Sequence, residues 1–191
     1  MPFALALLVT GCLPVLTSDD TGVASDWVAP SNDWPSSTPP GTLEGTGFKT
    51  GDVPPDFRLL DQHGQEVSLW QFYGMVVLLD VSTTWCGPCR VLAAEAEQTW
   101  HDYDDQGFIY VTLLAENERF EVPSQEDLEE WASDYGITAP ILSDSAGYAY
   151  QVEPNSGWPA LMLIGREMVI EVERVTPAED ATVRAAIEAA L

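Results

Sequence analysis

Two cysteines stand two residues apart, Cys86 and Cys89, in the stretch TTWCGPCR at 83–90. Sulfur atoms at this spacing can bind a metal ion, form a structural disulfide, or exchange electrons as a redox pair. A structural zinc site needs four thiolate or imidazole ligands, and the chain adds only two histidines and one distant cysteine. A disulfide that encloses two residues restrains the unfolded chain little and stabilises the fold weakly. The redox interpretation is therefore favoured, and no metal is expected.

The local sequence places these sulfurs where a strand passes into a helix. The continuous apolar run MVVLLDVS at 75–82 is typical of a strand buried on both faces. Good helix formers begin at the cysteines, so Cys86 lies at a helix N-terminus, where unpaired backbone N–H groups favour a thiolate. Pro88 is tolerated there because the first-turn amides have no helical partner. Cys89, one turn into the helix, can then attack a mixed disulfide formed at Cys86.

Strands alternate with helices in the part of the chain after residue 50. The segment around the polar turn at 61–65 predicts a β-hairpin, and further strands are predicted at 75–82, 107–115, 139–144, 159–165 and 168–175. Helices are predicted at 89–103, at 123–136 with a cap at Ser124 and a stop at Gly136, and at 177–191 with Pro177 in the first turn. The expected fold class is α/β, a central mixed sheet with helices on both faces and an N-terminal β-hairpin extension.

The first twelve residues predict an export signal. The apolar run FALALLV at 3–9 is too short to span a bilayer as a helix, and it is followed by small residues, as in the apolar core of a signal peptide. The VTGC stretch at 9–12 resembles a bacterial lipoprotein cleavage box, which implies that Cys12 is acylated, although no basic residue precedes the apolar run. A signal without acylation, or an incidental buried cysteine, is the alternative. We expect an exported protein, attached to a bacterial membrane by its lipid alone and facing the periplasm or the cell exterior.

Residues 13–49 are rich in Ser, Thr, Pro, Gly and Asp, and contain few apolar side chains to bury. We therefore predict a disordered tether with a coil dimension of about 35 Å, followed by one domain at 50–191. Trp27 and Trp34 each follow an aspartate in this tether. They could dock on the domain or on a partner, but we expect no role for them.

The charge balance restricts the partners. The chain has 31 acidic and 7 basic residues and a net charge of −24, while 46% of its residues are hydrophobic, enough for one core. Such a charge repels phosphate backbones and anionic lipid head groups, so no nucleic-acid partner is expected. A strongly solvated surface accounts for the charge most simply, and selection of a basic partner is the alternative. We expect a monomer.

The stretch LLDVSTTWCGPCR at 78–90 closely resembles the active-site segment of thioredoxins. Together with GDVPPDF at 51–57, it is similar to the redoxin group, especially the membrane-anchored TlpA-type thiol–disulfide oxidoreductases. This resemblance covers about residues 50–175 and implies a thioredoxin-like fold without a cofactor. It also implies a redox disulfide, with Cys86 as the attacking and Cys89 as the resolving cysteine, and with Gly87 and Pro88 shaping the loop between them.

Four further residues acquire expected roles from the resemblance. Pro159, in SGWPALMLIG, matches a cis-proline that lies opposite the disulfide; a trans proline at the start of a strand is the alternative. Asp80, six residues before Cys86, matches a buried acid whose raised pKa lets it relay the proton of the resolving thiol; an aspartate that only accepts hydrogen bonds is the alternative. Trp85 and Trp158 would place two indoles near the disulfide and narrow the cleft.

The sequence departs from the TlpA pattern in two places. That group often has Glu three residues after the second cysteine, where this chain has Leu92, and a helix-kinking proline where it has Ala94. We therefore expect a straighter helix. These departures, together with the bulky Trp158, leave the substrate class open and do not affect the exchange chemistry.

Two other functions share the fold. Peroxiredoxins place Thr three residues before the reactive cysteine, as Thr83 is here, but they also want Pro where this chain has Leu79. Copper chaperones of this fold need a wider cysteine spacing and a distant histidine, and no histidine follows His101. A peroxiredoxin-like thiol peroxidase and a non-catalytic metal- or partner-binding module therefore remain alternatives.

The expected function is electron exchange with protein thiols and disulfides outside the cytoplasm. A Cys-Gly-Pro-Cys core favours a reducing potential, near that of thioredoxin at about −270 mV. We therefore expect a reductase, which outside the cytoplasm must receive electrons from a membrane donor of the thiol-relay type. The client protein and the direction of electron flow stay open at this point.

Overall fold

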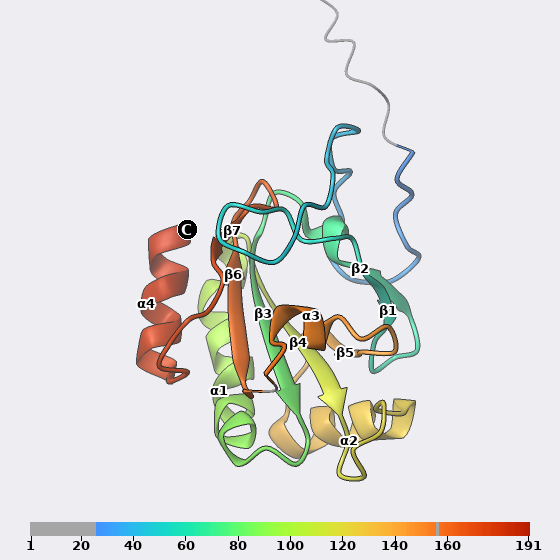
Figure 1. Cartoon of the computed structure of the whole chain (residues 1–191), viewed down its shortest axis with the longest axis vertical. Coiled ribbons are helices and arrows are strands. Elements are labelled where there is room, and N and C mark those ends of the chain that lie inside the picture. Colours follow the sequence, from blue (N-terminus) through green and yellow to red (C-terminus); the bar gives the residue numbers. More distant parts are fainter. Residues whose placement is uncertain (1–25, 156) are drawn as a thin grey trace, which may run out of the picture.

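Five strands form the central sheet of the computed structural model, which describes residues 26–155 and 157–191 (Figure 1). The spatial order is β5-β4-β3-β6-β7; β3, β4 and β5 are parallel to one another, and β6 is antiparallel to both of its neighbours, β3 and β7. The strands are β3 (Val76–Thr83), β4 (Phe108–Glu116), β5 (Ile141–Ser143), β6 (Ala160–Ile164) and β7 (Ile170–Val172). The predicted mixed sheet is confirmed, and β3 at its centre carries the chain directly to the cysteine pair.

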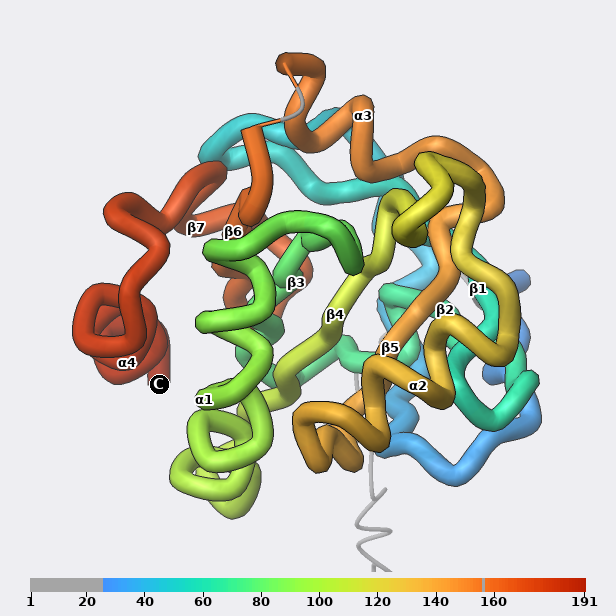
Figure 2. The backbone as a smooth tube through the Cα atoms, turned by 90° about the horizontal axis from the view of Figure 1, so that it is seen from below, coloured from blue at the N-terminus to red at the C-terminus, as the bar shows by residue number. Residues whose placement is uncertain are grey.

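The alternation of side chains along the strands divides the core into two clusters. Val76 and Leu78 of β3 point to one face, where they pack with helices α1, α2 and α4. These helices are α1 (Gly87–Tyr103), α2 (Gln125–Tyr135) and α4 (Asp180–Ala190). Figure 2 shows all three on the same side of the strands. Because β3 and β4 are apolar on both faces, the sheet is covered on both sides, as parallel strands require.

The other face is covered mainly by the N-terminal part of the domain. Val77 and Leu79 pack there against Phe57, Val67 and other side chains of the hairpin region. The elements are β1 (Arg58–Leu60), β2 (Glu66–Ser68) and η1 (Leu69–Phe72), with the short helix α3 (Ala149–Val152) beside them; η2 (Asp104–Gln106) follows α1. The predicted hairpin is present, since β1 and β2 pair in antiparallel fashion. Helix α3 was not predicted, because four residues are too few to show a helical period.

Residues 26–49, the described part of the predicted tether, lie against the hairpin side of the domain (Figures 1 and 2). The indole of Trp27 donates to Asp56 over 3.0 Å and that of Trp34 to Asp61 over 2.6 Å. The side chain of Asn32 donates to Gln71 over 3.0 Å. In this part the structure differs from the predicted disorder: Trp34, Leu43 and Phe48 supply apolar packing, and the two indoles and Asn32 supply hydrogen bonds that hold an otherwise polar segment.

The helix ends agree with the sequence at α2 and differ at α4. Ser124 caps α2 and Gly136 ends it in the left-handed conformation, as predicted. Helix α4 begins only at Asp180, so the prediction of Pro177 in its first turn was wrong. Val175 still donates a backbone hydrogen bond to Leu161 and packs in the same cluster as Val183 and Ile187 of α4, so the residues between it and the helix form a short link on that face of the sheet. Among the described residues, no helix is long and apolar enough to cross a membrane.

Candidate active site

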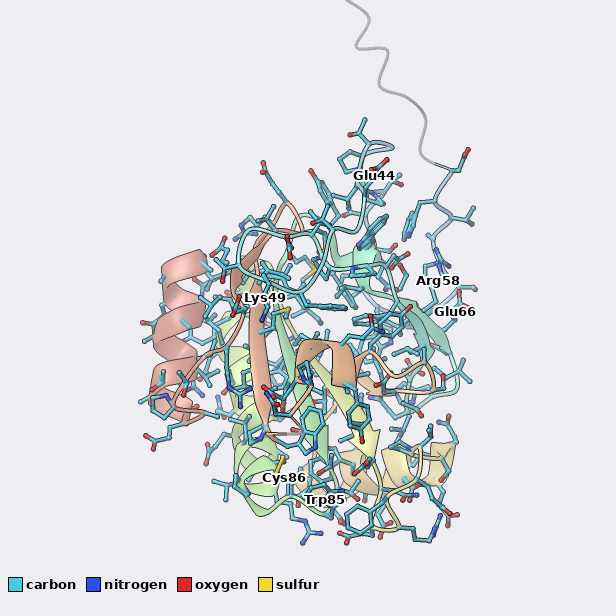
Figure 3. The ribbon with its side chains drawn as sticks, viewed as in Figure 1. Glu44, Lys49, Arg58, Glu66, Trp85 and Cys86 are labelled. Carbon is cyan, nitrogen blue, oxygen red and sulfur yellow. A yellow bond between two sulfur atoms is a disulfide. The ribbon has the colours of Figure 1, made fainter. Side chains whose placement is uncertain are left out.

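The two cysteines form a disulfide at the N-terminus of α1, with their Cα atoms 5.2 Å apart. Cys86 is the N-cap of this helix, and its Sγ accepts a hydrogen bond from the backbone N–H of Cys89 over 3.2 Å. Cys86 exposes 5% of its surface and Cys89 none. Cys86 is therefore the member of the pair that presents any surface to a partner. Figure 3 shows it beside Trp85, at the end of the molecule away from the hairpin ion pair of Arg58 and Glu66.

Asp80 is buried in β3 on the same face as Leu78, which packs in the cluster that contains both cysteines. Its two carboxylate oxygens accept hydrogen bonds from Ser82 over 2.6 Å and from Tyr110 over 2.9 Å. Burial raises the pKa of Asp80 to about 6, although these two hydrogen bonds act in the opposite direction. A carboxyl group with this pKa changes its protonation state near neutral pH, which is what a proton relay requires.

The Trp158–Pro159 peptide is cis. Ala160, the next residue, pairs with Val81 of β3. Pro159 therefore lies near the carboxyl end of β3, from which the chain continues to Cys86. Trp85 and Trp158 are half-buried and pack against the cluster that contains the two cysteines. The structure therefore brings both indoles to the cluster that contains the disulfide.

Glu116, at the end of β4, connects the two sides of this site. Its carboxylate accepts a hydrogen bond from the indole of Trp85 over 3.0 Å and another from the hydroxyl of Tyr150. The latter bond is the main cause that raises the pKa of Tyr150 to about 12. The ring of Tyr150 lies edge-on to Trp158, 5.8 Å between centroids. One carboxylate thus holds the residue before Cys86 and, through Tyr150, the residue before Pro159.

The sequence analysis missed Glu116 and Tyr150. Both belong to the site only because β4 lies beside β3 and α3 beside β4, and neither stands in a local motif. The one available signal was the position of Glu116 at the end of an apolar run next to β3, since parallel strands end at the same edge of a sheet.

The remaining residues that the sequence analysis singled out are located as follows in the structure. Gly87 and Pro88 are exposed in the first turn of α1. Leu92 is buried, and α1 runs without interruption from Gly87 to Tyr103 through Ala94. Cys12 lies outside the described residues. Within residues 26–155 and 157–191, no group of three or more His, Cys, Asp or Glu side chains is placed to hold a metal ion.

Comparisons with known proteins agree with this arrangement. A model of the AhpC/TSA family matches residues 50–173. The thioredoxin-like protein YneN of Bacillus subtilis is 33% identical over 125 residues, which are 65% of this chain and 71% of YneN. The thiol-disulfide oxidoreductase ResA of Oceanobacillus iheyensis is 26% identical over 52% of this chain, and the match spans only about half of ResA, 51%.

Solved structures show the same fold. A Chlorobium tepidum protein described as thiol:disulfide interchange protein DsbE superimposes with a TM-score of 0.64 at 27% identity, over 74% of this chain and 97% of that one. The thioredoxin domain of a Bacteroides vulgatus thiol-disulfide oxidoreductase does so with a TM-score of 0.62 at 22% identity, over 73% and 96%.

Fold and site together define a redoxin with a thioredoxin-like fold and a paired-cysteine centre. The chain belongs to the AhpC/TSA family. The predicted class, a thiol–disulfide oxidoreductase of the redoxin type, is confirmed.

Proposed function

We propose that the protein reduces disulfides of polypeptide clients outside the cytoplasm through the Cys86–Cys89 pair. The observation that carries the proposal is the position of Cys86 as N-cap of α1, with its Sγ facing the N–H of Cys89. In the reduced protein that N–H and the helix dipole stabilise an anionic sulfur, which is the nucleophile in thiol–disulfide exchange.

The exchange takes two steps. The thiolate of Cys86 attacks one sulfur of the client disulfide, forms a mixed disulfide and releases the other client sulfur as a thiolate. Cys89 then attacks the sulfur of Cys86, forms the intramolecular disulfide and releases the second client thiolate. The proton of Cys89 passes to Asp80, and solvent protonates the client. Two electrons move from the protein to the client, and a membrane donor of the thiol-relay type restores them.

The positions around the sulfurs have supporting roles in this proposal. Trp85, Gly87 and Pro88 shape the attacking side. Trp158 and the cis-Pro159 form the opposite wall, where the backbone next to a cis-proline can receive an extended client chain.

The location is part of the proposal. Acylated Cys12 anchors the protein to a bacterial membrane, and the protein, a monomer, faces the periplasm or the exterior. The hydrogen bonds of Trp27 and Trp34 hold residues 26–49 against the domain, so this part of the predicted tether adds little reach.

Peroxide reduction is the second candidate. The AhpC/TSA match and the position of Thr83 support it. The hydroxyl of Thr83 is buried and has no hydrogen-bond partner among the described residues. A peroxide turnover assay separates this activity from dithiol exchange.

The test is insulin reduction together with a redox equilibrium. We expect the reduced protein to reduce insulin and Cys86→Ser to abolish this activity. Equilibration with glutathione should give a reduction potential of about −270 mV for the cysteine pair. Activity that survives Cys86→Ser would end the catalytic assignment. A potential near about −180 mV, as in protein disulfide isomerase, would reverse the direction of electron flow.

A further inference from the structure

Three exposed apolar side chains, Phe120, Val122 and Tyr150, form a ledge beside the disulfide. Their exposed fractions are 67%, 54% and 41%, and all three line one groove of about 240 Å³. The ring of Phe120 lies 5.3 Å from that of Trp85, the residue before Cys86. Direct contacts therefore join the groove to the loop that carries the attacking sulfur.

The loop after β4 holds Phe120 in place at a conformational cost. Phe120 has a φ of 59°, in the left-handed region that bulky side chains rarely adopt. Buried Asn117 stabilises this turn: its backbone N–H donates to Glu121 over 2.9 Å, and its backbone carbonyl accepts from the N–H of Phe120 over 3.0 Å. Because Phe120 is exposed, packing in the core does not explain an aromatic residue at this position.

The surroundings of the ledge are strongly negative. Residues 116–134, which include the loop and α2, contain eight acidic residues and one basic residue, Arg119. Arg119 is paired with Glu121 at 2.8 Å, and the nearby Arg90 is paired with Glu118. The local field therefore favours a cationic partner and repels an acidic one.

We propose that this ledge docks the client polypeptide and selects an extended segment in which the disulfide cysteine is flanked by an apolar side chain and by Lys or Arg. The inference rests on the proposed function and adds the substrate class. The apolar side chain packs on Phe120 and Val122, and the acidic surface attracts the cation. Docking then holds the client sulfur near Cys86. As the client S–S bond breaks, the Cys86–Cys89 bond forms, and two electrons and two protons pass to the client.

Single-turnover reduction by the pre-reduced full-length protein tests the selectivity with three probes. One is a peptide closed by a disulfide whose cysteines are flanked by Leu and Lys, and the second has Ser and Glu in the same positions. The third is hydroxyethyl disulfide, which is too small to reach the ledge. We expect the Leu/Lys peptide to react about tenfold faster than the Ser/Glu peptide at low ionic strength, and this ratio to fall as salt is added.

The variant Phe120→Asn tests the ledge itself. Asn adopts the left-handed conformation at low cost, so we expect an equal or higher melting temperature. Relative to hydroxyethyl disulfide, the Leu/Lys peptide should react about fivefold more slowly than with the wild type, because only the peptide loses an apolar contact, whereas any loosening of Trp85 slows both probes alike. The matched control is Leu60→Thr, at an exposed apolar position of β1 with 53% exposure, and it should change neither rate.

The outcomes separate the two proposals. If hydroxyethyl disulfide is reduced but both peptides react equally, or if Phe120→Asn leaves the peptide rate unchanged relative to that of hydroxyethyl disulfide, the docking inference is overturned and the oxidoreductase function stands. If the reduced protein acts on none of the three probes, the proposed function itself fails.

Discussion

Tryptophan side chains donate hydrogen bonds to carboxylates in two regions of the molecule. In the N-terminal region, the indole of Trp34 donates to Asp61 over 2.6 Å, across 27 positions of the chain. Near the disulfide, the indole of Trp85 donates to Glu116 over 3.0 Å, across 31 positions. Both bonds join segments that are far apart in the sequence, yet their surroundings differ.

The difference lies in what else each carboxylate binds. Asp61 also accepts the backbone N–H groups of His63 and Gln65, both over 2.9 Å, so it closes the hairpin turn. Glu116 instead accepts from Tyr150, an exposed side chain that completes no turn. The first carboxylate is tied into the backbone, whereas the second positions side chains around two sulfurs. Disturbing the first region should therefore lower stability, and disturbing the second should alter exchange.

Of all the substitutions near the disulfide, Cys89→Ser should have the largest effect on exchange. Without the resolving sulfur, the mixed disulfide at Cys86 is not released, and we expect turnover to fall roughly 10³-fold. The client should remain covalently attached, which non-reducing electrophoresis and mass spectrometry detect. Stability should change little compared with the reduced wild type. Normal turnover, or the absence of any adduct, would contradict the assigned order of attack.

Asp80→Asn should have the next largest effect on the rate of exchange. If Asp80 takes the proton of Cys89, its removal should slow the second step at pH 7 by about tenfold or more. The wild-type rate should rise as pH increases through about 6, the pKa of this group, and the variant should lose this rise. Stopped-flow measurement of mixed-disulfide decay across pH checks both. A pH profile that is identical in both proteins would show that Asp80 only accepts hydrogen bonds.

Asp80→Asn should slow exchange, but at neutral pH it should increase the free energy of unfolding. Because burial raises the pKa of Asp80 in the folded state, the folded protein holds a proton that the unfolded chain has released between pH about 4 and 6. Wild-type stability therefore falls as pH rises through this window, by about 2–3 kcal/mol if no other group titrates. Asp80→Asn should remove this fall. Urea unfolding at pH 4.5 and pH 7 measures this fall. If the free energy of unfolding changes equally with pH in both proteins, the assignment is refuted.

Trp34→Phe tests the N-terminal region. The substitution keeps an aromatic ring but leaves Asp61 without its indole donor, so we expect a loss of about 1 kcal/mol in the free energy of unfolding. Reduction of hydroxyethyl disulfide should be unchanged. Trp85→Phe is the matched control, and it should show the reverse: altered exchange with little change in stability. Loss of exchange in Trp34→Phe would show that the two regions are coupled.

The parts of the molecule that the sequence predicted are those in which one local pattern determines the structure. The apolar run before Cys86 predicts β3, and the residues from Ser124 to Gly136 predict α2. The cis-proline position followed from a family motif. Such patterns depend on neighbours along the chain, so they can be read without coordinates.

The parts that were missed depend on contacts between distant segments. A segment rich in Ser and Pro is predicted as a tether unless the partners of its tryptophans are known, and these partners, Asp56 and Asp61, lie on either side of β1. Glu116 looked like one more solvated acid among the 31 acidic residues. Only the pairing of β4 with β3 brings it to Trp85.

The smallest and most specific prediction concerns Glu116→Gln. The amide keeps one oxygen acceptor but loses the charge that favours the neutral hydroxyl of Tyr150. The pKa of Tyr150, about 12 in the wild type, should therefore move back toward 10, and absorbance titration of phenolate measures this shift. With Trp85 held less firmly, we expect a two- to threefold slower reduction of hydroxyethyl disulfide, a cost of about 0.5 kcal/mol.

Glu130→Gln, on the same acidic surface, is the control for charge alone, since its carboxylate makes no hydrogen bond to Trp85. It should leave both the titration of Tyr150 and the rate with this neutral probe unchanged. Equal effects of the two variants would mean that Glu116 acts through the general field of the surface. A change confined to Glu116→Gln would show that one carboxylate, placed by strand pairing, sets the position of the indole beside the reactive sulfur.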